Sequence, residues 1–235
     1  MNPEIEKVLS GESDGCIVQG DSVGVLPTIP DASSVLVLTD PPYGIAYNRE
    51  KTPQGKHVHS NRKQVAIVEG DDAPFDPSPL LRFRNLILWG ANCYASKLPN
   101  NPVWLAWDKV TRNGLKLRIA EIELAWTNCV GRPRCFRYLW SGAYREDERG
   151  DSFHPTQKPI ALMQWCIGIA RPEPKVILDP YCGAGSTCIA AKQLGRKYIG
   201  IEINKGYCDI ARDRLLQLDG KRLGKLHKHP GFFDE

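Results

Sequence analysis

Residues able to bind and orient a planar base stand together at Asp40-Pro41-Pro42-Tyr43. The Asp40 carboxylate and the Pro41 carbonyl are hydrogen-bond acceptors, and the Tyr43 ring is a flat surface for stacking. The two prolines lack backbone N–H groups and fix φ at about −65°, so a stiff, extended loop is expected here. These groups suit a base that carries an exocyclic amino group. An ordinary strand-to-turn junction is the structural alternative.

A second candidate loop contains Gly183 and Gly185, which allow a ligand to approach the backbone closely. The next apolar segment ends at Glu202, where a carboxylate can bind ribose hydroxyls. The dinucleotide fingerprint is incomplete because Cys188 occupies its third glycine position, and only one strand and one helix follow. A dehydrogenase is therefore disfavoured, and S-adenosylmethionine is the leading ligand. A glycine turn without a ligand is the structural alternative.

The elements that must position these loops alternate between strands and helices, which predicts an α/β fold with a mostly parallel sheet covered on both faces. Seven strands are expected, at Gly15–Asp21, Ser34–Asp40, Asn85–Gly90, Pro102–Lys109, Ile122–Asn128, Lys175–Tyr181 and Lys197–Ile203. The clearest helical patterns are Ile160–Ala170, Ser186–Leu194 and Tyr207–Leu218.

The glycine loop lies late in the chain, although the first strand begins at residue 15. A circular permutation explains this order, with Gly15–Asp21 lying beside Lys197–Ile203 in the sheet. Asp21 would then project from the carboxyl end of its strand, near the ligand of the glycine loop.

Length and composition indicate one soluble domain over residues 1–235. The sequence has no apolar run long enough to cross a bilayer and no signal-peptide core, so a cytoplasmic protein without membrane association is expected. Its eight cysteines form no C-x-x-C pair and are expected to be reduced thiols. His57 and His59 lack nearby acidic or cysteine partners, so no metal site is predicted.

Positive charge is concentrated in two polar stretches, about 44–80 and 129–153. Their basic residues, the second set interleaved with Phe136, Tyr138 and Trp140, are typical of a surface that tracks phosphates and stacks bases. A solvated loop with packed aromatics is the alternative. The candidate DNA-binding residues are Arg49, Lys51, Lys56, Arg62, Lys63, Arg132, Arg134 and Arg137.

Together these segments resemble the permuted, or β-class, amino-group DNA methyltransferases, including small phage and bacterial adenine-specific members. The resemblance rests on four elements in the family's order: Gly20-Asp21, Asp40-Pro41-Pro42-Tyr43, the stretch from His154 to Pro159, and the loop from Asp179 to Gly185. It implies a seven-stranded, Rossmann-like class I methyltransferase sheet with circularly permuted order. Tyr181 and Ala184 stand where the family most often has Phe and Ser.

The resemblance also implies roles. Asp40, Pro41, Pro42 and Tyr43 would be catalytic, holding a base flipped out of double-stranded DNA by its amino group. Cofactor contacts would come from Asp21, Thr156, Lys158, Asp179, Tyr181, Gly183, Gly185 and Glu202. Lys158 is the expected partner of the carboxylate of S-adenosylmethionine.

The main hypothesis is methylation of the N6 amino group of adenine in DNA, in a restriction-modification or phage setting. N4-cytosine methylation is the nearest rival, because it needs the same acceptors, but related proteins of that type more often carry Ser in place of Asp40. A catalytically inactive DNA-binding module with a methyltransferase fold is an alternative of a different class. A homodimer is compatible with the sequence, which does not encode the oligomeric state.

Overall fold

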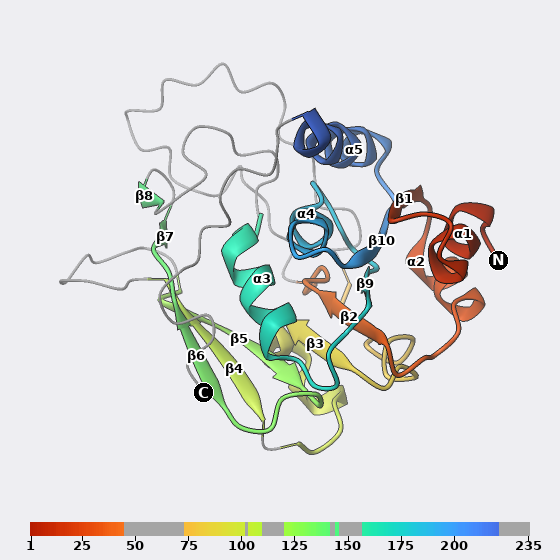
Figure 1. Ribbon diagram of the computed structural model, residues 1–235. Coiled ribbons are helices and arrows are strands. Elements are labelled where there is room, and N and C mark those ends of the chain that lie inside the picture. The colour runs from red at the N-terminus through yellow and green to blue at the C-terminus, as the bar shows by residue number, and fades with distance from the viewer. Residues whose placement is uncertain (45–72, 102, 110–119, 142–143, 146–156, 221–235) are drawn as a thin grey trace.

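The computed structural model describes residues 1–44, 73–101, 103–109, 120–141, 144–145 and 157–220 (Figure 1). Its main feature is an eight-stranded sheet with the order β1-β10-β9-β2-β3-β5-β4-β6. The strands of this sheet are β1 (Gly15–Gln19), β2 (Val35–Thr39), β3 (Leu86–Trp89), β4 (Trp104–Asp108), β5 (Ile122–Thr127), β6 (Arg134–Arg137), β9 (Val176–Asp179) and β10 (Lys197–Glu202). A separate hairpin joins β7 (Trp140–Ser141) to β8 (Tyr144–Arg145).

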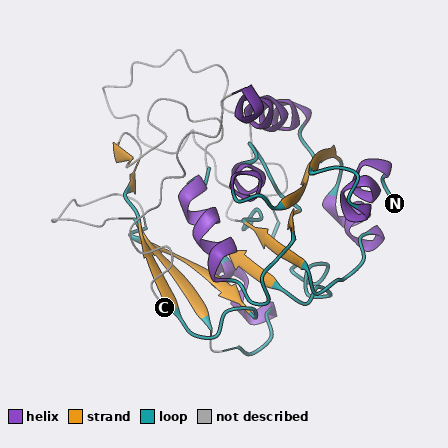
Figure 2. Ribbon diagram, viewed as in Figure 1, coloured by secondary structure: helices purple, strands orange, loops and turns teal. Residues whose placement is uncertain are grey.

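Helices lie in several connections between these strands, before the first strand and after the last (Figure 2). They are α1 (Pro3–Ser10), α2 (Ser22–Val25), α3 (Ile160–Ile169), α4 (Ser186–Gln193) and α5 (Lys205–Gly220), with the 3-10 segments η1 (Leu26–Thr28) and η3 (Ala91–Lys97). The α/β prediction and all three predicted helices are therefore confirmed. The helices α1 and α2 were not expected from the sequence.

The sheet buries both of its faces, because alternate residues of a strand point to opposite sides. In β2, Leu36 and Leu38 pack into a core formed with α3, α4 and α5. Val35 and Val37 of the same strand face a second core, which contains side chains of α1, η1 and η3. The run of four apolar residues in β2 is thus explained by two covered faces.

The predicted permuted order is confirmed. Strand β1 pairs in parallel with β10, from Gly15 opposite Tyr198 to Gln19 opposite Glu202. Strand β10 pairs in parallel with β9, and β9 with β2. Segments from the two ends of the chain therefore lie next to each other, and the glycine-loop strand is a direct neighbour of the strand that leads to Asp40.

The predicted strand count was wrong by one, because β6 forms within a stretch that was expected to be a loop insertion. It pairs in parallel with β4, with Phe136 opposite Trp107. The first predicted insertion, 44–80, lies mostly outside the described residues. No helix in the described part of the chain is long and apolar enough to cross a membrane.

Candidate active site

Four neighbouring parallel strands each lead to a carboxylate at the same edge of the sheet. In the order β1, β10, β9, β2, these are Asp21, Glu202, Asp179 and Asp40. Asp179 and Glu202 are the last residues of their strands, while Asp40 follows directly after β2 and Asp21 lies two residues beyond β1. The carboxyl ends of parallel strands are where open α/β sheets bind ligands. The structure therefore brings these four predicted residues to one edge.

Asp40 and Tyr43 contact each other within their loop, where the Tyr43 hydroxyl donates a hydrogen bond to Asp40 Oδ1. The Tyr43 ring packs against the backbone of Gly90, at the end of β3. Gly90 has a φ of 66°, and a Cβ built on it would lie 1.8 Å from Cε1 of Tyr43. Only glycine leaves room for the ring at this position.

The Lys158 ammonium lies beside this loop, near the N-terminus of α3. It forms an ion pair with Asp40 Oδ2, lies 3.1 Å from Glu123 Oε2 and 3.3 Å from the Tyr43 hydroxyl. The sequence predicted a role for Lys158 at the carboxylate of the cofactor. The structure places its ammonium against the Asp40 carboxylate, because α3 begins next to the loop that follows β2. The contact with the carboxylate of the cofactor stays a prediction.

The charges in this group shift one another's protonation. Burial raises the pKa of the Asp40 carboxyl, and the Lys158 ammonium opposes that rise. Burial alone would lower the pKa of Lys158, but Asp40, Tyr43 and Glu123 raise it well above its usual range. Burial likewise works against ionised Glu123, yet Lys158 and Lys109 together lower the pKa of this carboxyl. Lys158 and Glu123 are therefore held in their charged forms at neutral pH.

The glycine loop is fixed from the neighbouring strand by Glu202. Its two carboxylate oxygens accept hydrogen bonds from the backbone N–H groups of Gly183, at 2.9 Å, and Asn204, at 2.8 Å. Gly185 begins α4 with a φ of 83°, and a Cβ on it would approach the Cβ of Ala211 to 2.9 Å. Glu202 thus has a structural contact that the sequence did not reveal, in addition to its predicted place at the sheet edge.

Asp179 is buried beneath this loop. It accepts hydrogen bonds from Thr39 Oγ1, at 2.7 Å, and from the Tyr181 backbone N–H, at 3.1 Å. Burial raises its pKa to about 6, and the hydrogen bonds from Thr187, Thr39 and the Tyr181 backbone limit the rise. The Asp179 carboxyl therefore changes its charge in the weakly acidic range.

The remaining predicted cofactor residues lie around the same loops, apart from Thr156, which is outside the described residues. Asp21 caps α2 by accepting a hydrogen bond from the Val23 N–H at 3.0 Å. The Tyr181 ring contacts the edge of Phe75, with ring centroids 5.6 Å apart. Burial raises the pKa of Tyr181 to about 12, with further contributions from Asp21 and Asp76.

A family model described as DNA methylase, for N6 and N4 methyltransferases, matches residues 97–213. This stretch includes Glu123, Lys158, the glycine loop and Glu202. The chain belongs to this amino-methyltransferase family.

Comparisons with individual proteins agree with this family. The chain is 26% identical to the type II methyltransferase M.HinfI of Haemophilus influenzae, over 86% of this chain and 68% of that protein. The solved structure of an M1.HpyAVI–SAM complex is 21% identical with a TM-score of 0.50, covering 85% of this chain and 99% of the other. PvuII DNA methyltransferase, cytosine-N4-specific, is 15% identical with a TM-score of 0.54, covering 86% of both chains. These two structures share the class I methyltransferase fold with this family member.

The predicted base-stacking surface of the second insertion is not formed as expected. Phe136, Tyr138 and Trp140 are buried in the core, where Phe136 and Tyr138 stack with centroids 5.7 Å apart. Arg132 and Arg137 are exposed, and Arg137 lies 3.8 Å from Asp108. The aromatic rings are thus core residues, and binding of the arginines to DNA phosphates stays a prediction.

Arg134, the first residue of β6, is partly buried. The five candidate DNA-binding residues of the first predicted insertion lie outside the described residues. They are Arg49, Lys51, Lys56, Arg62 and Lys63. Within the described ranges, no group of three or more His, Cys, Asp or Glu side chains could hold a metal ion.

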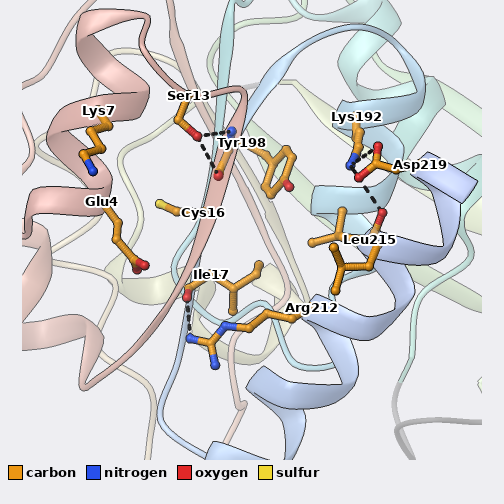
Figure 3. Close-up of a pocket in the computed structure, with 12 residues that line it drawn as sticks. Glu4, Lys7, Ser13, Cys16, Ile17, Lys192, Tyr198, Arg212, Leu215 and Asp219 are labelled. Carbon is orange, nitrogen blue, oxygen red and sulfur yellow. Dashed lines mark hydrogen bonds and ion pairs between the residues drawn. The ribbon is translucent and has the colours of Figure 1, made fainter.

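A separate hollow of about 410 Å³ lies between α1, β1, α4 and α5 (Figure 3). Side chains bind two backbone carbonyls of the edge strand β1 in this hollow. Arg212 donates to the Ile17 carbonyl at 2.7 Å, and the Ser13 hydroxyl donates to the Gly15 carbonyl at 3.1 Å. Lys192 in its wall is paired with Asp219. None of the predicted site residues lines this hollow. The side chains bound to the β1 carbonyls protect this edge of the sheet from pairing with another strand.

Proposed function

We propose that this protein is a DNA methyltransferase that uses S-adenosylmethionine and methylates the N6 amino group of a flipped adenine. The observation that carries the proposal is the parallel pairing of β2 with β9. This pairing puts the acceptor loop that begins at Asp40 beside the glycine loop that follows Asp179. A methyl acceptor and a methyl donor bound by the two loops would therefore meet in one place.

The residues of the glycine-loop side fit S-adenosylmethionine. This molecule carries an ammonium and a sulfonium, and the edge formed by β9, β10 and β1 ends in the carboxylates of Asp179, Glu202 and Asp21. Gly183, with a φ of 49°, has no side chain that could keep a ligand from the backbone of the loop. When bound, S-adenosylmethionine supplies an electrophilic methyl group on its sulfonium.

The residues of the acceptor loop fit an amino group attached to a ring. The lone pair of such a nitrogen is delocalised into the ring, so the amino group is a weak nucleophile. Asp40 and the Pro41 carbonyl would each accept one amino hydrogen, which directs the lone pair out of the ring plane. Tyr43 would stack on the base and align it for in-line displacement. Within a duplex this geometry cannot be reached, so the base must leave the stack.

Adenine is favoured over cytosine because Asp40 opens the acceptor loop, where N4-cytosine enzymes of the resembled family more often have Ser. PvuII methyltransferase, whose structure is similar, is described as cytosine-N4-specific, and both bases present an exocyclic amino group. Digestion of methylated DNA to nucleosides, followed by mass spectrometry, distinguishes the two products directly. N6-methyl-2′-deoxyadenosine is expected, and N4-methyl-2′-deoxycytidine would overturn the choice of base.

The decisive experiment compares wild-type protein with Asp40→Ala. Transfer of labelled methyl groups from S-adenosylmethionine to DNA is expected for the wild type and should be lost in the variant. Binding of S-adenosylmethionine, measured by calorimetry, should remain. A variant that methylates DNA at the wild-type rate would refute the proposed role of Asp40. A wild-type protein that binds DNA and S-adenosylmethionine without any methyl transfer would instead indicate a non-catalytic DNA-binding module.

A further inference from the structure

A row of charged side chains extends from the acceptor loop into the antiparallel part of the sheet. Asp40 pairs with Lys158, Lys158 lies 3.1 Å from Glu123, and Glu123 pairs through its other oxygen with Lys109. No motif in the sequence indicated Glu123 or Lys109. Their places in the row follow from the pairing of β4 with β5, which puts Trp107 opposite Glu123 and Asp108 opposite Ile122.

This row is buried and electrically balanced. Lys158 and Lys109 are each about 8% exposed, and two ammonium groups face the carboxylates of Asp40 and Glu123. Burying ions is costly unless each is paired, and removal of one partner leaves an uncompensated charge. The row therefore carries a large desolvation free energy, and apolar side chains would hold β5 against the acceptor loop without it. Its position next to Asp40 points to a functional reason.

We propose that Glu123, supported by Lys109, is a positioning residue that holds the Lys158 ammonium against Asp40 and so fixes the Asp40 carboxylate for the target amino group. This inference rests on the function proposed above. Glu123 does not reach the substrate: it acts on Lys158, and Lys158 acts on Asp40.

The contacts explain why a second carboxylate is needed. A lysine side chain is a flexible four-carbon stem with a point charge, which does not by itself define a direction. In this protein Lys158 is held from one side by Glu123 and from the other by Asp40 and the Tyr43 hydroxyl. Its position is thus defined by three partners instead of one.

The same contacts orient Asp40. Its Oδ2 is bound to Lys158 and its Oδ1 accepts from Tyr43, so the plane of the carboxylate is set by two donors. A carboxylate can accept about four hydrogen bonds, which leaves capacity for an amino hydrogen. Without Glu123, Lys158 can swing away, and one of the two donors that orient Asp40 is lost.

The test replaces Glu123 by Gln, which keeps the size of the side chain and removes its charge. The turnover number for methyl transfer should fall by up to about 100-fold, the cost of misplacing a catalytic group. The dissociation constant for S-adenosylmethionine and the KM for DNA should stay close to wild type. Glu121→Gln is the matched control, since Glu121 is exposed on the residue before β5, and it should leave turnover unchanged.

Lys109 supplies a second variant that keeps the charges balanced. Lys109→Met combined with Glu123→Gln removes one charge of each sign, so the double variant should fold even where Glu123→Gln alone is unstable. Because Lys109 acts through Glu123, Lys109→Met should lower turnover in the wild type and add little in the Glu123→Gln background. Additive losses would contradict the proposed order of contacts.

Two results would overturn the inference. One is wild-type turnover in the folded Glu123→Gln variant. The other is weaker binding of S-adenosylmethionine with unchanged turnover, which would assign Lys158 to the cofactor. NMR detection of the Lys158 ammonium, expected in wild type and lost in Glu123→Gln, tests the contact without any reaction. A wild-type protein that shows this signal but methylates nothing would refute the proposed function and leave the contact intact.

Discussion

The Thr39 hydroxyl donates a hydrogen bond to Asp179 Oδ1 across 2.7 Å. Thr39 is the last residue of β2 and Asp179 the last residue of β9, so this bond joins the two strands immediately before the acceptor loop and the glycine loop diverge. Both residues are buried. The two halves of the proposed active site are therefore linked at their bases by one pair of side chains.

Asp179→Asn should stabilise the protein above about pH 6. Burial raises the pKa of Asp179 to about 6 in the folded protein, from the ordinary value of 3.8 for an aspartate. The folded state therefore binds this proton more tightly, and stability falls as pH rises between these two values. About 2 pKa units correspond to roughly 3 kcal/mol, which is the upper bound of the gain from Asn at pH 8. Thermal melts from pH 4 to 8 should show the difference shrinking toward acid.

Asp76 provides a control, because its pKa is lowered in the folded protein, whereas that of Asp179 is raised. Hydrogen bonds from the Ser78 hydroxyl and backbone N–H lower the pKa of Asp76, which is exposed. The ionised Asp76 carboxyl stabilises the folded state at any pH above the pKa that this group has in the unfolded chain. This stabilisation is lost as the pH falls through the lower pKa that the group has in the folded protein. Asp76→Asn should therefore bring no gain at pH 8. If the wild-type protein is more stable than Asp179→Asn at every pH, burial of the ionised Asp179 carboxylate does not destabilise the folded state, and the prediction is wrong.

Gly90→Ala should abolish most methyl transfer while leaving the glycine loop intact. The new Cβ would lie 1.8 Å from the Tyr43 ring, so the ring must move away from its place beside Asp40. We expect turnover to fall by about 100-fold, with the affinity for S-adenosylmethionine unchanged. Steady-state kinetics and calorimetry measure the two effects separately. Gly131→Ala is the control, because a Cβ there meets nothing within 4 Å.

Glu202→Gln should weaken both the fold and the binding of S-adenosylmethionine. Gln keeps one acceptor oxygen, but its NH₂ group faces a backbone N–H of Gly183 or Asn204. A buried donor without an acceptor costs about 1–3 kcal/mol, and because these contacts are partly buried, urea denaturation should show a loss of about 1 kcal/mol. Glu6→Gln, an exposed change on α1, should cost little. Unchanged cofactor affinity in a folded Glu202→Gln variant would argue against the role of this side chain in shaping the glycine loop.

The sequence was sufficient for the parts of the fold that depend on local pattern. Apolar segments bounded by turn residues located seven strands, and the late position of Gly183 led to the correct pairing of β1 with β10. The eighth strand was missed because Arg134-Cys135-Phe136-Arg137 was interpreted by its charges. Its alternating burial, with Phe136 inward and Arg137 outward, is the period-two pattern that would have revealed it.

Contacts within the site can be predicted from the sequence where both residues belong to one loop. They cannot be predicted where the residues come from elements far apart in the sequence. Asp40 and Tyr43 are three residues apart, and their contact lies within one loop. Glu123 reaches Lys158 only because β5 runs antiparallel between β3 and β4, a pairing that no local pattern encodes. The ion pair between Lys158 and Asp40 is likewise a contact between elements far apart in the sequence.

The pairing of β1 with β10 also has a consequence for how the chain reaches this structure. Strands β1 and β2 leave the ribosome first, whereas their neighbours β10 and β9 leave last, more than 130 residues after β2. Contacts between segments so far apart in sequence form slowly, because the entropy cost of closing a long loop must be met before the contacts stabilise the chain. The largely apolar β2 can pair early with β3, but its other edge pairs with Val176–Asp179, which is synthesised much later. The central part of the sheet is therefore completed only after β9 has been synthesised, and a chain interrupted before β9 exposes an apolar strand edge that favours aggregation.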